Sequence, residues 1–200
     1  MKNKNMLFSL AVVFFLGLVV SPLHAAVRSW EIDKEHTNFY FSVDHVYAKV
    51  HGRFTDFKGT VLFDPDNLKD SKISFEIKAN SIDTGISKRD RHVLSADFLD
   101  AAKYPLITFT SNSISKGEGN IYNVSGTLTI KDVSSNLVLP LKYEGMKEHP
   151  LLKGTEVAGF NGRLTLDRLA YKVGDDKYYK MGAVGKDVDI LVTIEALYKK

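Results

Sequence analysis

Four consecutive ionisable side chains stand near the middle of the sequence: Arg89, Asp90, Arg91 and His92. Arginine and histidine donate strong hydrogen bonds to charged oxygens, so this group could hold the carboxylate, phosphate or quinone oxygen of a ligand's polar head. A structural role competes with this interpretation, because an acidic residue such as Asp90 is favourable near the N-terminus of a helix. We favour the structural role and keep Arg89 and His92, with His45, as the candidate head-group contacts.

Three histidines, His36, His45 and His51, raise the question of a metal site. Their spacings of nine and six residues match no compact ligand motif, and the chain has no H-x-x-x-H helix. His36 and His45 would lie at opposite ends of one strand, roughly 30 Å apart if that strand is straight. We therefore predict no metal site.

The sequence lacks the common catalytic motifs that would indicate an enzyme. The sequence contains no G-x-S-x-G nucleophile elbow, no phosphate-binding P-loop and no dinucleotide-binding glycine fingerprint. We predict a protein that is not an enzyme and that needs no cofactor. The remaining catalytic alternative is an enzyme acting on isoprenoid or quinone lipids, in which His92 works with Asp90 or Asp97. That alternative requires a perturbed histidine facing a cavity.

The N-terminus has the pattern of a secretory signal peptide. Lys2 and Lys4 precede an apolar run from Met6 to Val20, and Ala25-Ala26 follows a Ser-Pro break. The run is shorter than the ~20 residues that a membrane-spanning helix needs. We predict that residues 1–25 are cleaved and that residues 26–200 form one exported domain. The periplasm of a Gram-negative cell is the predicted location, with simple secretion as the alternative.

Charge and cysteine content exclude several function classes. The formal net charge is +3, and removing residues 1–25, which carry Lys2 and Lys4 and no acid, lowers it to +1. Basic residues are scattered rather than clustered on one face, so we expect no nucleic-acid partner. The chain has no cysteine, and therefore neither disulfides nor thiolate chemistry.

The elements that must position the charged cluster are mostly strands. Hydrophobic residues recur with a period of two along most of the chain, for example at Ile73, Phe75 and Ile77. One short amphipathic helix, which Ser87 could cap, is expected before Pro105. Because helices do not alternate with strands, a parallel α/β fold is excluded. We predict an all-β fold: a single antiparallel β-barrel of about eight strands with a short helical insertion, and a β-sandwich as the alternative.

The inward face of each strand predicts what the barrel encloses. Glycines recur on these faces at Gly59, Gly126 and Gly162, and missing side chains would leave room along the axis. The alternative is that these glycines only ease strand curvature. Phe54 is out of phase with Phe57, which predicts a bulge near Thr55-Asp56. The residues predicted to line an apolar tunnel are Phe39, Phe41, Val43, Phe57, Val61, Phe63, Phe75, Ile77, Ile107, Phe109, Leu128, Leu139, Phe160 and Ile190.

Several short motifs follow one another in a fixed order along the chain. In the central region they are S-I-D-T from Ser81, R-D-x-H from Arg89, S-A-D-F-L from Ser95 and A-x-K-Y-P from Ala101. In this order and spacing they resemble the motifs of the YceI-like polyisoprenoid-binding family of bacterial periplasmic proteins. Similar motifs open the chain (32–45 and 50–59) and close it (187–196), so the resemblance covers nearly the whole predicted domain. Residues 167–182 match the family least well, and no barrel mouth is assigned to them.

The resemblance implies a lipocalin-like barrel that holds a polyisoprenoid or a related lipid and has no established catalytic centre. We accordingly predict a periplasmic carrier for a long isoprenoid, such as a polyprenyl chain or an isoprenoid quinone. Contact with the membrane would be transient, for lipid exchange, and a homodimer is left open. The alternatives are the enzyme described above and a packed barrel that serves as an interaction module in the cell envelope.

Overall fold

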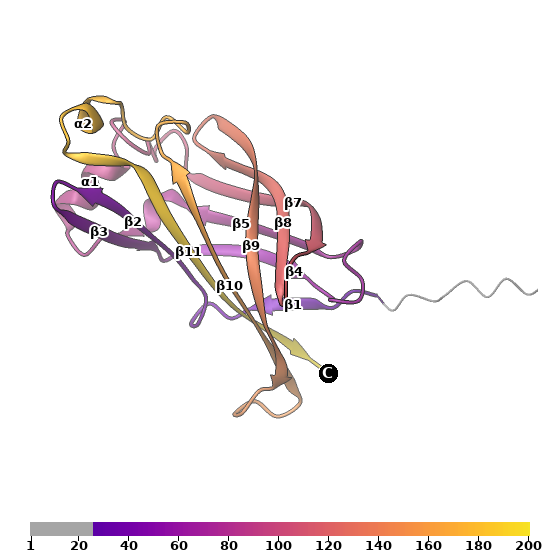
Figure 1. Ribbon diagram of the computed structural model, residues 1–200. Helices are drawn as coiled ribbons and strands as arrows, with labels where there is room; N and C mark the ends of the chain where they lie inside the picture. Colours follow the sequence, from indigo (N-terminus) through magenta and orange to yellow (C-terminus); the bar gives the residue numbers. More distant parts are fainter. Residues whose placement is uncertain (1–25) are drawn as a thin grey trace, which may run out of the picture.

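The computed structural model describes residues 26–200 (Figure 1). The predicted signal peptide falls on residues 1–25 and lies outside this range. The described residues form eleven strands, two short α-helices and one 3₁₀ turn. In chain order they are β1 (Ser29–Ile32), β2 (Asn38–His45), β3 (Ala48–Phe54), β4 (Phe57–Leu62), β5 (Lys72–Lys78), η1 (Ala79–Ser81), β6 (Ile82–Asp83), α1 (Ser87–Leu94), β7 (Leu106–Lys116), β8 (Ile121–Ile130), β9 (Val133–Glu148), β10 (Thr155–Asp167), α2 (Lys177–Lys180) and β11 (Val184–Lys199).

These strands close into a barrel of eight antiparallel strands, as the period-two pattern predicts. All pairings are antiparallel, and the order β1-β4-β5-β7-β8-β9-β10-β11 returns to β1. Three of the eight strands are interrupted, so each is recorded as two segments. β11 pairs with both β1 and β2, β2 pairs with β3 beside the β1–β4 pair, and β3 pairs with β6 beside the β4–β5 pair. The β1–β11 pair closes the sheet on itself, whereas β3 is paired on its second side only at Arg53 and Phe54, by β6.

The three interruptions lie on neighbouring strands, at residues 33–37, 55–56 and 79–81. The second one is the predicted bulge. There the Thr55 N–H donates to the Ser81 carbonyl, and the Lys78 N–H donates to the Asp56 carbonyl. Thr55 and Asp56 stand where a regular strand would have a single residue, and this one extra residue lets Phe54 and Phe57 both point into the barrel.

One half of the barrel, which we call the packed half, has a filled interior. Its core includes Trp30, Val61, Phe63, Tyr122 and Phe160, each at most 4% exposed. Phe63 lies at the centre, and its ring makes edge-to-face contacts with Tyr122 and Phe160 at centroid distances of 5.0 Å. Four aromatic rings, including that of Tyr143, therefore meet on the axis and close it.

The opposite half, which we call the hollow half, carries both helices at its end (Figure 1). α1 follows β6, and α2 lies in the loop between β10 and β11. The turn between β2 and β3 joins this end, because the Val46 N–H donates to the Ala183 carbonyl. The expected cap by Ser87 is wrong: Ile86 is the N-cap residue, without a side-chain hydrogen bond. Within residues 26–200, neither helix is long and apolar enough to cross a membrane.

The inward glycines do not leave empty space, in contrast to the expectation from the sequence. A Cβ at Gly126 would lie 2.6 Å from Cζ of Phe109, and one at Gly59 would lie 2.6 Å from Cδ1 of Phe75. At Gly162 the space is taken by Leu141 in the same way. A side chain of the neighbouring strand covers each glycine, because the period-two pattern places it on the same face.

Candidate ligand cavity

The hollow half contains an apolar cavity of about 420 Å³. Strands β2, β3, β7, β10 and β11 form its walls, and α1 and the 168–183 loop cover its end. A second cavity of about 120 Å³ adjoins it toward the packed half. Both are lined by Phe41, Phe54, Ile107, Ile130, Leu166 and Ile190. Met181 lines the larger cavity and is 63% exposed, so that cavity reaches the surface beside α2.

Most of the side chains predicted to line a tunnel border these two cavities. Phe41, Ile107 and Ile190 line both, and Val43 lines the larger one. The smaller cavity is lined in addition by Phe39, Phe75, Ile77, Phe109, Leu128 and Leu139. The period-two phases thus place these residues correctly on the inward face.

The other four predicted lining residues, Phe57, Val61, Phe63 and Phe160, line neither cavity. They point inward, as their phases require, but they lie in the packed core and are at most 5% exposed. The ring of Phe57 packs edge-on at 5.0 Å against Phe39, which does line the smaller cavity. The expectation that these four line a tunnel is therefore wrong, because aromatic rings fill the axis at their level.

The three polar head-group candidates, His45, Arg89 and His92, all line the larger cavity. Arg89 donates from Nε to the Thr84 hydroxyl at 2.8 Å and from Nη2 to the Thr84 carbonyl at 2.6 Å. Asp90 accepts hydrogen bonds from the Thr84 N–H and hydroxyl. Arg89 and Asp90 therefore hold the start of α1 against β6, which is the structural role favoured from the sequence, while Arg89 also faces the cavity.

The proposed catalytic pairing of His92 with Asp90 does not form, because Asp90 bonds to Thr84. His92 instead lies 3.3 Å from a carboxylate oxygen of Asp97. Its ring also contacts Phe98 edge-on, at a centroid distance of 5.1 Å. His92 is thus held at the rim of the cavity by Asp97 and aromatic neighbours.

Sequence reasoning missed the contribution of the 168–183 loop to this site. Arg168, Tyr171, Val173, Tyr178 and Met181 all line the larger cavity. Tyr178 stacks on Phe98 at 5.5 Å, which joins this loop to the segment after α1. The tyrosine content of the loop was visible in the sequence, but no periodicity indicated which of its side chains face inward.

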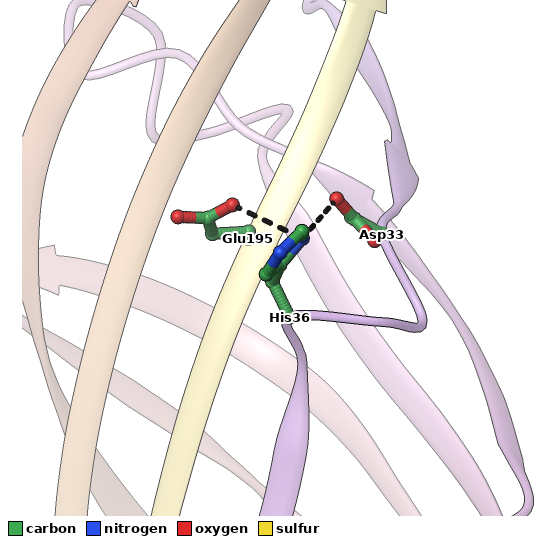
Figure 2. Close-up of side chains that lie close together, drawn as sticks. All are labelled: Asp33, His36 and Glu195. Atoms are coloured by element: carbon green, nitrogen blue, oxygen red, sulfur yellow. Dashed lines mark hydrogen bonds and ion pairs between the residues drawn. The ribbon is translucent and has the colours of Figure 1, made fainter.

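A separate cluster of ligand-type side chains lies at the first strand interruption (Figure 2). His36 projects from the loop before β2 between Asp33 and Glu195, with Nδ1 2.8 Å from Asp33 Oδ2 and 3.8 Å from Glu195 Oε2. The cluster differs from the His36, His45 and His51 set considered above, and none of its members lines either cavity.

The ionic interactions within this cluster account for its location at the first strand interruption. Burial acts to raise the pKa of Asp33, but hydrogen bonds from His36 and from the Glu35 N–H outweigh it and lower that pKa. The hydrogen bond to Asp33 and its negative charge raise the pKa of His36. The pair closes the loop at residues 33–37, which the Asp33 N–H also ties to the Glu195 carbonyl.

This chain belongs to the class of small single-domain antiparallel β-barrels, whose interior is either filled by side chains or wide enough for one small ligand. The model of the YceI-like domain matches residues 30–196, and the chain belongs to this family.

Curated relatives and solved structures agree with this membership. Protein YceI of Escherichia coli O157:H7 is 33% identical over 195 residues, which cover 96% of this chain and 98% of the relative. The crystal structure of Burkholderia cenocepacia BcnA is 26% identical, has a TM-score of 0.73, and is covered completely by 84% of this chain. A polyisoprenoid-binding domain from Saccharophagus degradans has the same fold, with a TM-score of 0.64 at 16% identity over 85% of this chain and 98% of that domain.

Proposed function

We propose that this protein is a periplasmic carrier that holds the apolar chain of an isoprenoid or a similar lipid in the hollow half of its barrel. The cavity is the observation that carries the proposal: its volume of about 420 Å³ lies within the range of ligand pockets, and its walls are largely aliphatic and aromatic. Membership of the YceI-like family and the polyisoprenoid-binding domain with the same fold support a lipid ligand.

The lipid binds because its hydrocarbon chain is buried in the cavity, away from water. Each methylene group that leaves water contributes ~0.8 kcal/mol, so affinity rises with chain length until the space is filled. The lipid's hydrocarbon chain enters beside α2, where Met181 is exposed, and passes Ile107 and Ile190 into the smaller cavity. The rings of Phe39, Phe57 and Phe75 limit its depth, since they pack edge to face with centroids 5.0 Å apart.

An interaction module with a packed centre fits the interior less well. That alternative needs inward side chains to close the axis over its whole length, and they do so only in the packed half. An apolar space that no protein side chain fills is better explained by a ligand.

Two substitutions on neighbouring residues of β7 test the location of the chain. Ile107 lines both cavities, whereas Leu106 points outward, lines neither cavity and is 40% exposed. Ile107→Trp should block the passage between the cavities and shorten the longest polyprenol that the protein takes up. Leu106→Trp adds the same ring outside the barrel and should leave uptake unchanged.

Native mass spectrometry of protein purified without detergent, before and after addition of polyprenols of graded length, measures this uptake. A wild-type protein that stays free of ligand under both conditions would overturn the carrier proposal. Equal chain-length limits for wild type and Ile107→Trp would instead show that the lipid lies elsewhere.

The proposed periplasmic location requires export, and the signal-peptide pattern of residues 1–25 is the reason to expect it. Cell fractionation followed by N-terminal sequencing should find a periplasmic protein that begins at Ala26. A protein retained in the cytoplasm with Met1 intact would contradict it.

Exchange of lipid with the membrane would be transient. Light scattering of the purified protein distinguishes a monomer from the homodimer left open by the sequence.

A further inference from the structure

Arg168 is a buried cation at the start of the 168–183 loop, which covers the end of the larger cavity. It directly follows β10, lines the cavity and is only 5% exposed. Its guanidinium donates from Nε to the Gly185 carbonyl and from Nη1 to the Val173 carbonyl, both at 2.8 Å. Longer bonds reach the carbonyls of Asp175 at 3.4 Å and Val184 at 3.3 Å. A guanidinium has five N–H groups, so these four bonds leave one N–H available.

The charge of Arg168 has no anionic partner among residues 26–200. Asp167 pairs with Lys186 and accepts a hydrogen bond from the Leu169 N–H, and Asp175 accepts one from the Lys177 N–H. Burial lowers the pKa of Arg168, and the charges of Asp167 and Asp175 only partly offset this effect. Four neutral carbonyl dipoles therefore solvate a cation that is removed from water, which is a costly arrangement without a counter-ion.

The lining of the larger cavity likewise contains basic side chains without acidic ones. Its ionisable members include Arg89, His45 and His92 in addition to Arg168, and no aspartate or glutamate is among them. The smaller cavity, deeper in the barrel, has no charged side chain in its lining. A molecule that lies along both cavities thus meets basic groups at one end and only uncharged, mainly hydrophobic groups at the other.

We propose that the cavity selects single-chain lipids with an anionic head, a carboxylate or a phosphate monoester, and that Arg168 is the residue that binds this head. The inference rests on the proposed function and deepens it by naming the head group. The free N–H of Arg168 bonds the anion, whose negative charge compensates the buried guanidinium in a site of low dielectric constant. The apolar chain extends past Ile107 toward Phe109.

A purely structural role is the competing explanation, since the guanidinium also fixes the 168–183 loop through its carbonyl bonds. The two roles differ in what they do to selectivity. Loss of a structural clamp weakens every ligand alike, whereas loss of an anion-binding group weakens anionic ligands and spares the neutral one. The informative quantity is therefore the ratio of affinities for ligands that share one chain.

Farnesol, farnesoic acid and farnesyl phosphate form such a set, with the same chain and three different heads. Titration calorimetry with each compound, below its micelle-forming concentration, gives the affinities for the full mature protein. We expect the wild type to bind the better of the two anions at least about tenfold more tightly than farnesol, the fold-change typical of a hydrogen bond to a charged group. The carboxylate and phosphate arms show which head the site takes.

Arg168→Gln should reduce this preference to less than about threefold, while farnesol binding persists. Arg163→Gln is the matched control and should leave the preference unchanged, because Arg163 is exposed on β10 and lines neither cavity. Arg89→Gln tests the other arginine of the lining and should leave at least half of the preference, because Arg89 already bonds Thr84. Circular dichroism checks that all variants fold. If Arg168→Gln does not fold, the wild-type ratio still decides the question of selectivity, and Arg168→Lys, which keeps the charge, should retain a preference for the anion.

Each failure has a different meaning. Equal affinity of the wild type for farnesol and both anions overturns the anionic selectivity and leaves the carrier function in place. A preference that Arg89→Gln abolishes and Arg168→Gln preserves overturns the role of Arg168. No binding of any of the three compounds contradicts the proposed function itself.

Discussion

The packed and hollow halves of the barrel are formed by the same eight strands with the same alternation of inward and outward residues, yet only one of them is filled. In the packed half, the rings of Phe63, Tyr122, Tyr143 and Phe160 reach the axis and touch one another. In the hollow half, many inward positions carry short β-branched side chains, namely Val43, Val50, Ile107, Ile130, Val184, Val188 and Ile190.

The comparison of the two halves separates the direction of a side chain from its length. Alternation decides which side chains face the interior, but the reach of those side chains decides whether the interior is filled. The close-packed core and the apolar cavity thereby lie at different ends of one barrel. The aromatic core provides most of the close packing, while the aliphatic walls and the 168–183 loop enclose the cavity.

The largest expected effect comes from truncating a leucine in each half. Leu141 is fully buried in the packed half, and Leu166 is half-buried and lines both cavities. Leu141→Ala should lower the free energy of unfolding by about 3 to 5 kcal/mol, since it creates a new void. Leu166→Ala should cost less than about 2 kcal/mol, because it enlarges a space that already exists. Urea unfolding of both variants measures the difference, and equal costs would mean that the hollow half closes in solution.

A smaller effect is expected from adding a methyl group at a covered glycine. In Gly126→Ala the new Cβ would lie 2.5 Å from the Thr110 carbonyl oxygen and 2.6 Å from Cζ of Phe109. Backbone and ring must both move, which should cost about 1 to 3 kcal/mol of stability. Gly159→Ala is the control, because its Cβ would approach Glu144 Cβ only to an ordinary 3.5 Å. Thermal unfolding that showed the same loss for both variants would contradict the crowding at Gly126.

The smallest effect concerns the ion pair between His36 and Asp33, outside both interiors. The pKa of His36 is raised above its ordinary value of 6.5, so its contribution is complete below about pH 6.5 and is lost as the pH rises through the folded-state value. The pKa of Asp33 is lowered below 3.8, so its contribution is lost only as the pH falls through that lower value.

The melting temperature of His36→Gln should therefore fall below that of the wild type between about pH 4 and pH 6.5 and converge with it in alkaline buffer. The Lys58→Gln variant, which removes an exposed ion pair with Glu76 elsewhere on the barrel, provides the control without a histidine. A difference that grows with rising pH would have the wrong sign for this pair.

Much of the fold follows from the sequence, and its limits have physical causes. The phases of the strands and the bulge at Thr55-Asp56 were predicted because both are local consequences of period two. The room expected at Gly126 was wrong, because the ring that fills it belongs to Phe109, 17 residues earlier in the chain. Arg168 was not found, since its place in the cavity depends on carbonyl groups of a loop without periodicity and of the start of β11.

The covered glycines also restrict how such a barrel can evolve. Gly52 is covered by Phe41 and Gly126 by Phe109, and both of these rings line a cavity. A single mutation that exchanges either ring for a smaller aliphatic residue lengthens the cavity and needs no change at the glycine. At Gly52 a side chain is tolerated only after the Phe41 ring has been lost, whereas at Gly126 the Thr110 carbonyl oxygen, 2.5 Å from the new Cβ, blocks a side chain as well. We expect lineages to reach longer ligands in single steps, and to reach shorter ones through ordered pairs of substitutions.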